Sequence, residues 1–354
     1  MTPGAPLTVL VLAVGGNVSQ GILKALARAR RACRVVGADI RADHAGLFWV
    51  DRARVSPWAH EPEFLPWLID CCRHEGVQLI LSGAEPVLMA LAQHRGRIEA
   101  ETGACCLVSD WEVMETCDDK WKTAQWLAAR GSEGPESAIT DDPGSVDALA
   151  ARCGFPLVAK PRRGGGARGF FAVQDAADLD YIRRKPGYLI QAYAGSPEQE
   201  YTVACFADRD GVLAPSCCMR RDLVAGTTFR ATLGDFPDIR AAAESIVAAL
   251  KPLGPCNVQL RQTNRGPVCF EINPRFSGTA PIRAHYGYND VEAAINHFLL
   301  GEPVRLPLIT RGEALRYWNE VYVEPEALEA LREAGSLESP GQHALIDTAP
   351  RERG

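Results

Sequence analysis

Polar side chains suited to metal binding alternate with apolar ones between Cys256 and Arg275. Two such alternating runs flank the turn residues 264–266 (Asn-Arg-Gly), which predicts a β-hairpin. The polar face of this hairpin is predicted to carry Gln259, Glu271 and Asn273. Carboxylate and amide oxygens suit a hard cation, and Mg²⁺ completes its shell with water and phosphate oxygens. We therefore expect a Mg²⁺ or Mn²⁺ site here.

The opposite face of the hairpin is predicted to be apolar and to lie on the core. Its expected members are Val258, Leu260, Phe270 and Ile272, with Cys269 on the polar side. Arg275 follows the second run and could meet a transferring phosphoryl group. The alternation alone also fits a half-exposed hairpin with an ordinary solvated face.

A second candidate functional site lies around Lys160, which ends the apolar run Phe155–Lys160. The loop that follows contains Gly164, Gly165, Gly166 and Gly169, and its backbone N–H groups could cradle phosphate. It is not a Walker A loop, because no Gly-Lys-Ser/Thr closes it. A flexible surface turn beside a solvated lysine is the alternative.

Five segments in order together resemble the ATP-grasp enzymes, nearest to the branch of the carbamoyl phosphate synthetase large subunit and the carboxylate-amine ligases. They are Lys120 after two aspartates, Pro-Leu-Val-Ala-Lys-Pro with its glycine loop, Leu-Ile-Gln-Ala-Tyr with Glu-Tyr-Thr-Val, Asn-Val-Gln, and Phe-Glu-Ile-Asn-Pro-Arg-Phe-Ser-Gly. The resemblance covers about residues 5–300.

The resemblance implies roles for individual residues. Lys120 and Lys160 would bind the ATP phosphates beneath the loop 164–169, and Glu200 would hold the ribose hydroxyls. Gln191, Ala192 and Tyr193 would form the hinge beside adenine. Glu271 and Asn273, supported by Gln259, would hold two magnesium ions, and Arg275 would stabilise an acyl phosphate.

The chain also departs from the family pattern. The hinge lacks the usual acidic residue, since Gln191-Ala192 stands there. Residues 224–228 (Val-Ala-Gly-Thr-Thr) replace the synthetase's histidine-bearing segment, which argues against bicarbonate chemistry. Gly278 stands where that enzyme has a second arginine after Asn-Pro-Arg.

Two further arginines, Arg221 and Arg283, flank the hairpin in sequence and are candidates to clamp a substrate carboxylate. A structural position on a helix or strand is the alternative. Near the N-terminus, Gly15 and Gly16 lie between a strand and a helix, as in dinucleotide-binding proteins, and Gly21 follows them. Their spacing is not Gly-x-Gly-x-x-Gly, which argues against a dehydrogenase.

The alternation of strands and helices predicts a parallel-sheet domain in an α/β chain. The resemblance implies that a two-subdomain ATP-grasp fold (α+β) with a glycine-rich lid loop follows it. The expected domains are residues 1–110 (N-terminal), 111–190 (small lid subdomain), 191–305 (catalytic subdomain) and 306–354 (C-terminal extension). Strands are expected at Val212–Met219 and Ala314–Val323, and a helix at Pro325–Ala334. The extension could complete a substrate pocket or a homodimer contact.

Composition limits the possible partners. The 354 residues carry a formal net charge of -6, which argues against a nucleic-acid or anionic-membrane partner. No apolar run reaches the length of a membrane span, and no basic leader precedes Leu7, so a cytoplasmic protein is expected.

Taken together, the residues and the resemblance predict an enzyme that uses ATP to activate a small-molecule carboxylate as an acyl phosphate. An amine would then displace phosphate, leaving ADP. Carboxyphosphate chemistry like that of carbamoyl phosphate synthetase, or a nucleotide-binding regulator without turnover, are the alternatives.

Overall fold

The computed structural model describes residues 6–165 and 168–346, and the chain forms two compact units. The first contains the residues up to Ser109, Arg275–Pro307, and the residues from Arg316 on. The second contains Asp110–Pro274 and Leu308–Leu315. This division differs from the expected domains, because the segment after the metal hairpin belongs with the N-terminal unit.

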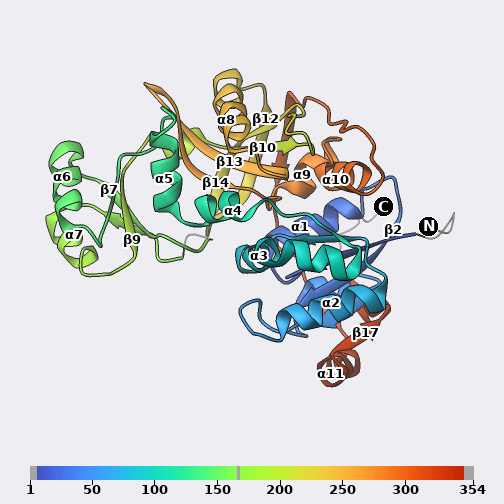
Figure 1. The fold of residues 1–354 in the computed structure, drawn as a ribbon. Helices are drawn as coiled ribbons and strands as arrows, with labels where there is room; N and C mark the ends of the chain where they lie inside the picture. Colours follow the sequence, from blue (N-terminus) through green and yellow to red (C-terminus); the bar gives the residue numbers. More distant parts are fainter. Residues whose placement is uncertain (1–5, 166–167, 347–354) are drawn as a thin grey trace, which may run out of the picture. The chain divides into compact units, whose positions relative to one another are not determined.

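The first unit is built on a six-stranded sheet in the order β17-β3-β2-β1-β4-β5 (Figure 1). Its strands are β1 (Leu7–Leu12), β2 (Cys33–Asp39), β3 (Arg52–Val55), β4 (Leu79–Ser82), β5 (Cys105–Cys106) and β17 (Ser336–Glu338). All neighbours pair in parallel except β17, which is antiparallel to β3. Every residue of β1 is buried, as in a parallel strand covered on both faces.

Helices cover this sheet, as the alternating pattern predicts. They are α1 (Asn17–Leu26), η1 (Ala45–Phe48), α2 (Phe64–Glu75), α3 (Glu85–Thr102), α9 (Ala280–His285), α10 (Asp290–Phe298), α11 (Pro325–Ala334) and η3 (Pro340–His343). α1 packs against α9 and α10, which explains why these late helices belong to the N-terminal unit. The small sheet β16 (Val321–Val323) with β18 (Ala344–Ile346) completes the unit.

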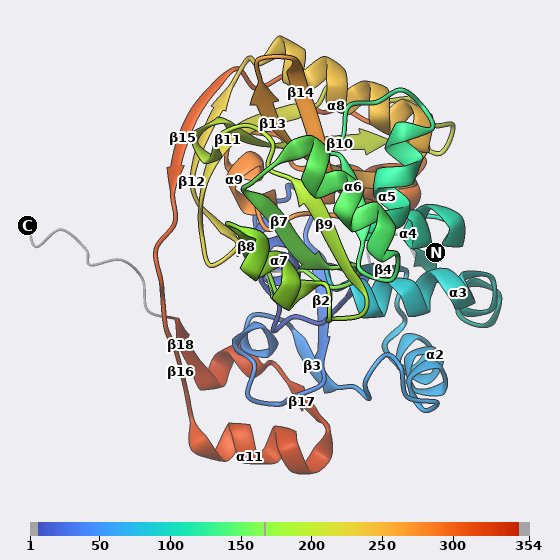
Figure 2. The same ribbon diagram turned by 90° about the vertical axis from the view of Figure 1, so that its left-hand side faces the viewer.

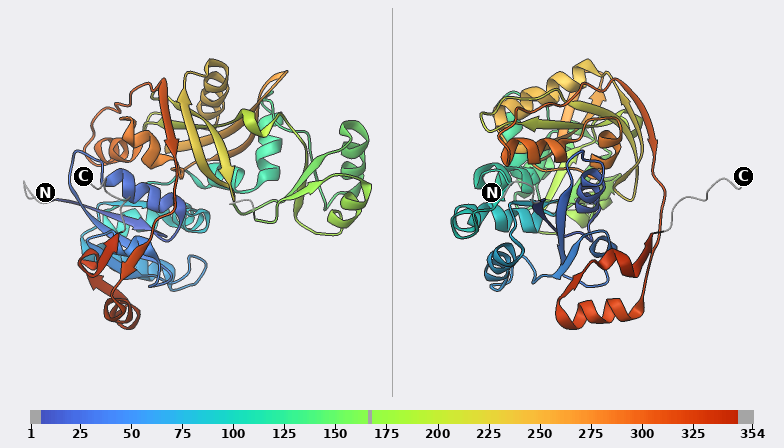
Figure 3. Two further views of the ribbon diagram at one scale, coloured as in Figure 1. Left: turned by 180° about the vertical axis from the view of Figure 1, so that it is seen from behind. Right: turned by 90° about the vertical axis from the view of Figure 1, so that its right-hand side faces the viewer.

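The second unit contains two antiparallel sheets. The smaller has the order β6-β9-β7-β8, formed by β6 (Ser137–Ile139), β7 (Leu157–Pro161), β8 (Phe171–Val173) and β9 (Tyr188–Ala192). Helices α6 (Pro143–Cys153) and α7 (Ala176–Ile182) lie on one face of it, as the green elements of Figures 1 and 3 show. Val146 and Leu149 of α6 share a buried cluster with Leu179 and Ile182 of α7.

The larger sheet has the order β14-β13-β10-β11-β12-β15, with β15 at its outer edge beside β12 (Figure 2). Its strands are β10 (Glu200–Ala207), β11 (Cys217–Val224), β12 (Thr227–Gly234), β13 (Gly254–Thr263), β14 (Gly266–Asn273) and β15 (Arg311–Leu315). α8 (Pro237–Leu250) packs on β10, β13 and β14, while α4 (Trp111–Asp118) and α5 (Lys120–Ala128) pack on β14; η2 (Pro197–Gln199) precedes β10.

The fold class predicted from the sequence is confirmed: a parallel-sheet domain is followed by the two antiparallel sheets of an ATP-grasp fold. Two strand predictions are wrong. β11 begins at Cys217 instead of Val212, and Ala314–Val323 is split between β15 and β16. The helix at Pro325–Ala334 is confirmed. Among the described residues, every helix is too short or too polar to traverse a bilayer.

Candidate active site

The β13–β14 hairpin brings the predicted polar side chains to one face. Gln259 lies directly opposite Glu271, and Asn257 lies opposite Asn273. In antiparallel pairs, directly opposed side chains share a face and lie within contact distance. The predicted metal-binding side chains therefore come together on one wall of the second unit.

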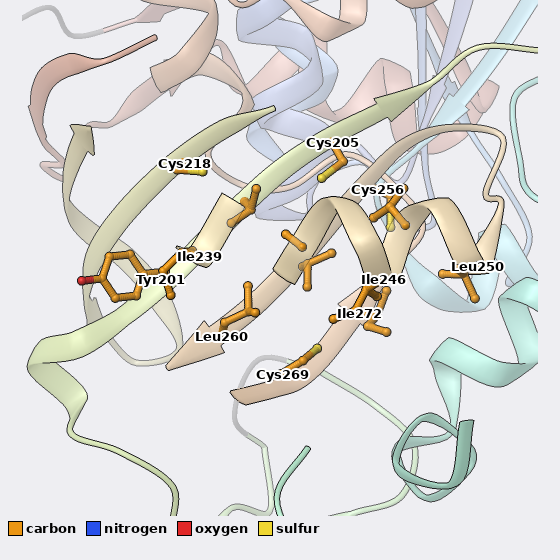
Figure 4. Close-up of a cluster of buried hydrophobic side chains, with 14 of the residues drawn as sticks. Tyr201, Cys205, Cys218, Ile239, Ile246, Leu250, Cys256, Leu260, Cys269 and Ile272 are labelled. Carbon is orange, nitrogen blue, oxygen red and sulfur yellow. The ribbon is translucent and has the colours of Figure 1, made fainter. Parts of the chain in front are cut away.

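The apolar face of the hairpin differs from the prediction at one point. The register shifts between Gln259 and Leu260, so that Leu260 opposes Cys269 and Phe270 becomes an extra residue. A bulge of this kind re-aims side chains. Cys269 is consequently buried in the core with Ile272 (Figure 4), whereas Phe270 and Glu271 both line a pocket. The placement of Phe270 on the core and Cys269 on the polar face was wrong.

This pocket opens to solvent, has a volume of about 240 Å³ and is lined entirely by the second unit. Ten of the predicted nucleotide- and metal-binding residues line it: Lys120, Lys160, Gly164, Gly165, Gln191, Ala192, Tyr193, Glu200, Gln259 and Glu271. Gly166 lies outside the described residues. Gly169 is not a lining residue, and its backbone packs so closely that a Cβ would lie 2.7 Å from Pro161 Cγ.

Glu271 is the only carboxylate in the predicted metal set. Its Oε1 accepts hydrogen bonds from Gln259 Nε2 (3.3 Å) and Asn273 Nδ2 (2.9 Å). Gln259 Oε1 accepts from Arg221 Nη2 at 2.6 Å, so this oxygen faces an arginine. The arrangement fits Glu271 and Asn273 as cation ligands and gives Gln259 an orienting role. Within the described ranges, no three His, Cys, Asp or Glu side chains form a metal cluster.

Lys160 ends β7 beside Phe270. Its Nζ lies 5.8 Å from the Phe270 ring centroid and donates to the Phe270 carbonyl at 3.5 Å. Burial lowers the pKa of Lys160 to about 8, the charge of Glu271 opposes this shift, and that of Lys120 adds to it. An anion in the pocket would favour the charged form.

Lys120 is held against the glycine loop by its neighbours. Its Nζ donates to the Gly164 carbonyl at 2.5 Å, and its backbone N–H donates to the Arg162 carbonyl. Asp119 caps α5 at Trp121 N and accepts two hydrogen bonds from Arg162, at 2.6 and 3.1 Å. The ion pair between Asp119 and Arg162 joins the start of α5 to the end of β7, and so fixes the position of Lys120.

The predicted hinge follows β9. Gln191 is buried and donates to Ser137 Oγ, while the Ala192 N–H donates to the Glu136 carbonyl. Tyr193 is 40% exposed at the pocket, and the Arg261 guanidinium lies 5.2 Å from its ring centroid.

Glu200, the predicted ribose ligand, is buried between two arginines. Arg221 donates to its Oε1 at 2.8 and 3.1 Å, and Arg261 donates to its Oε2 at 2.8 and 3.0 Å. Arg221 thus lies in the pocket wall, as expected for a site residue, but is paired with protein groups. Arg261 was not predicted, although its alternation with Gln259 placed both on one face of the strand.

Two predicted arginines lie in the first unit. Arg275 pairs with Glu85, with its Nε 2.9 Å from Oε1, and also donates to the Phe276 carbonyl. Arg283 is 1% exposed and donates to Asp290, Ser277 and Thr279. A substrate carboxylate could reach Arg283 only by displacing a buried ion pair, so this structure contradicts its assignment as a clamp.

The fold and this pocket have the features of an ATP-grasp domain, and the comparisons with family models agree. Residues 186–320 match the family model described as ATP-grasp in the biosynthetic pathway with Ter operon. Residues 9–105 match the model described as PylC-like, N-terminal domain. The chain thus combines an ATP-grasp domain with a PylC-like N-terminal domain, which confirms the predicted resemblance.

Curated relatives cover part of the chain. Over 220 residues it is 30% identical to the uncharacterized protein y4rH of Sinorhizobium fredii, covering 56% of this chain and 43% of that one. It is 24% identical to the carbamoyl phosphate synthase arginine-specific large chain of Bacillus subtilis, covering 62% and 23%. It is 30% identical to a probable alpha-L-glutamate ligase of Stenotrophomonas maltophilia, covering 51% and 64%. The chain thus spans less than two thirds of the length of each.

Solved structures share the fold at low identity. N5-carboxyaminoimidazole ribonucleotide synthetase from Thermus thermophilus aligns with a TM-score of 0.67 at 18% identity, covering 86% of this chain and 81% of that one. L-amino acid ligase from Bacillus licheniformis aligns with a TM-score of 0.62 at 16% identity, covering 82% and 73%.

Proposed function

We propose that this protein is an ATP-dependent, ADP-forming ligase that activates a small-molecule carboxylate and couples it to an amine. One observation carries the proposal: a bulge in β14 turns Glu271 into the pocket that Lys120, Lys160 and the glycine loop line. Cations, loop backbone and a metal-binding carboxylate are the groups that phosphoryl transfer requires together. The relatives named as ligases and synthetases support this reading.

Different residues would bind phosphate, exclude water and bind the metal. Lys120 and Lys160 neutralise phosphate charge, and Gly164 and Gly165 bring loop backbone close enough to exclude water from an acyl phosphate. Glu271 and Asn273 would hold Mg²⁺, which supplies Lewis-acid stabilisation of the transferring group. The wall beside them carries Arg221 and Arg261, which keep the carboxylate of Glu200 fixed at the expected ribose end.

We favour an amine acceptor over carboxyphosphate chemistry. The turn between β11 and β12 contains Ala225 and Gly226, and no histidine stands in residues 224–228. This departs from the synthetase pattern, whereas a probable glutamate ligase is among the relatives. We expect the protein to act in the cytoplasm, because all twelve cysteines are free thiols, as in a reducing compartment. Binding of a second copy of the chain stays a prediction.

The deciding experiment measures magnesium-dependent release of ADP and phosphate from ATP across a matrix of carboxylates and amines. We expect release to require one acid and one amine together and to disappear in Glu271→Ala. Glu313→Ala, which removes a surface carboxylate on β15, is the matched control. Tight ATP binding without release for any pair would instead support a nucleotide-binding regulator.

A further inference from the structure

Two cations in the first unit have no acidic partner among the residues that the structure describes. Arg316 donates to Asn17 Oδ1 at 3.2 Å and to the Gly278 carbonyl at 2.6 Å, both neutral oxygens. Lys24 lies over the ring of Trp49, with its Nζ 5.2 Å from the centroid. In the described part of the chain, neither side chain forms an ion pair with a carboxylate. Elsewhere in this acidic chain, buried arginines such as Arg221 and Arg283 are paired with carboxylates.

Helix geometry brings these cations to the same place. Asn17, Gly21 and Lys24 are spaced by four and three residues, and therefore lie along one face of α1. Arg316 is hydrogen bonded to Asn17 at the start of this same face. Gly21 lies against the turn before α9, since a Cβ there would be 3.2 Å from Pro281 Cδ.

Electrostatics agree with this placement. Burial lowers the pKa of Lys24, and the nearby charge of Arg316 lowers it further, although part of Lys24 stays exposed. Burial also lowers the pKa of Arg316. Trp49 Nε1 is buried and has no acceptor within the described residues. A bound anion would relieve the repulsion between these two cations on a partly desolvated surface.

Gly278 makes room for this arrangement. A Cβ at this position would lie 2.5 Å from Asn17 Nδ2, so glycine allows Asn17 and Arg316 to meet at the Gly278 carbonyl. Gly278 thus stands where the carbamoyl phosphate synthetase pattern has an arginine. In this chain the guanidinium of Arg316 donates to the Gly278 carbonyl instead.

We propose that Lys24 and Arg316 form a binding site for a carboxylate of one of the ligase substrates. The carboxylate would lie between the ammonium and the guanidinium, which supplies a planar pair of donors. The choice of a substrate carboxylate rests on the proposed function. The anion site itself does not rest on that function, because it is argued from the contacts and charges of Lys24 and Arg316 within the described residues.

Competitive labelling of lysines tests the site without turnover. The full chain would be acetylated with limiting reagent at pH 8, in chloride or in glutarate, succinate, acetate or inorganic phosphate at equal ionic strength. Peptide mass spectrometry would then quantify each lysine. An ion pair raises an amine pKa by about one unit or more, so a bound carboxylate should slow labelling of Lys24 about tenfold.

Internal and mutational controls make the result specific. Lys185 also lies over an aromatic ring, 4.7 Å from the centroid of Tyr181, and its labelling should not change with the anion. Arg316→Gln should abolish protection of Lys24, and Arg316→Lys should keep part of it. Circular dichroism would confirm that both variants fold. If Arg316→Gln does not fold, Arg316→Lys, which retains the charge, still tests the site.

Each outcome decides one point. Equal labelling of Lys24 in all salts, or protection that persists in Arg316→Gln, would overturn the site. Protection by phosphate but by none of the carboxylates would overturn the assignment of a carboxylate. Protection by a carboxylate in a chain that releases no ADP would keep the anion site and reject the ligase, so the two failures are distinguishable.

Discussion

Gln259 and Glu271 face each other across the β13–β14 hairpin, and Gln259 is also hydrogen bonded to Arg221. The amide of Gln259 therefore links a buried arginine to the carboxylate that would bind the metal. Because its oxygen faces Arg221, we propose that Gln259 orients Glu271 and is not itself a cation ligand. This relationship separates a metal ligand from the residue that positions it.

Replacing these two residues should have different consequences. Gln259→Ala should weaken apparent Mg²⁺ affinity by about 10–100-fold and leave activity at saturating Mg²⁺ measurable, as for other residues that orient a ligand. Glu271→Ala should abolish ADP release at every Mg²⁺ concentration. Titrating Mg²⁺ against ADP release in both variants checks this. If both variants lost ADP release to the same extent, and excess Mg²⁺ did not restore it in Gln259→Ala, Gln259 would itself be a metal ligand.

Nucleotide affinity should depend on pH through Lys160. The pKa of this ammonium is about 8 in the free protein, against an ordinary value of 10.5. Phosphate binding favours the charged form, so the affinity for ADP should fall up to tenfold per pH unit above pH 8. Calorimetric titration with ADP between pH 7 and 9.5 measures this fall.

Lys160→Arg is the matched control, because arginine stays charged and should give a flat profile over this range. The stability of the free chain should change with the opposite sign. Since the folded pKa is below the unfolded value, the unfolded chain binds more protons between pH 8 and 10.5. The contribution of Lys160 to the free energy of unfolding therefore rises over that interval. A wild-type ADP affinity that is constant across pH 8 would contradict the assignment of Lys160.

The cluster of Glu200 with Arg221 and Arg261 should stabilise the larger sheet. Glu200→Gln would leave two poorly exposed guanidinium groups without a carboxylate, a loss of about 3–5 kcal/mol when the pair is buried. Urea denaturation measures the change in the free energy of unfolding. Glu136→Gln, which breaks an exposed pair with Arg152, should cost less than about 1 kcal/mol. Similar values for both variants would show that the cluster is not structural.

The contrast between Gln259 and Glu200 shows which parts of the site the sequence could predict. The two-residue period predicted correctly that Gln259 and Glu271 share the polar face. Their direct pairing depends on the bulge, since an unbroken ladder from the turn would oppose Gln259 to Phe270. The bulge at Phe270 was missed because one extra residue leaves a short alternating pattern apparently intact. The partners of Glu200 are 21 and 61 residues away, and their meeting depends on the order β13-β10-β11, which local pattern does not encode.

Asp119 should stabilise the base of the glycine loop. Burial alone would raise its pKa, but the hydrogen bonds from Arg162 and Trp121 outweigh this and hold the pKa below its ordinary value. Asp119→Asn should lower the free energy of unfolding at pH 7 by about 1.5–3 kcal/mol. The wild-type contribution is present above the unfolded pKa and is lost as pH falls through the folded one, so the two proteins should converge in acid.

Urea denaturation at pH 7 and pH 3 measures both effects of Asp119→Asn. Asp147→Asn breaks a pair between Arg183 and a largely exposed carboxylate and serves as the control, with an expected change below about 1 kcal/mol. A difference between wild type and Asp119→Asn that stays constant between the two pH values would exclude the carboxylate as its source.

Gly278 should matter through the position of Asn17. In Gly278→Ala the new Cβ would lie 2.5 Å from Asn17 Nδ2, so the Asn17 side chain must turn and its hydrogen bond to Arg316 must break. We expect a loss of about 1–2 kcal/mol in the free energy of unfolding, measured with urea, together with weaker anion protection of Lys24. Asn17→Ala in the same chain removes the clash and should restore stability but not protection. If Gly278→Ala retained full protection of Lys24, the contact of Arg316 with Asn17 would not be what positions the guanidinium.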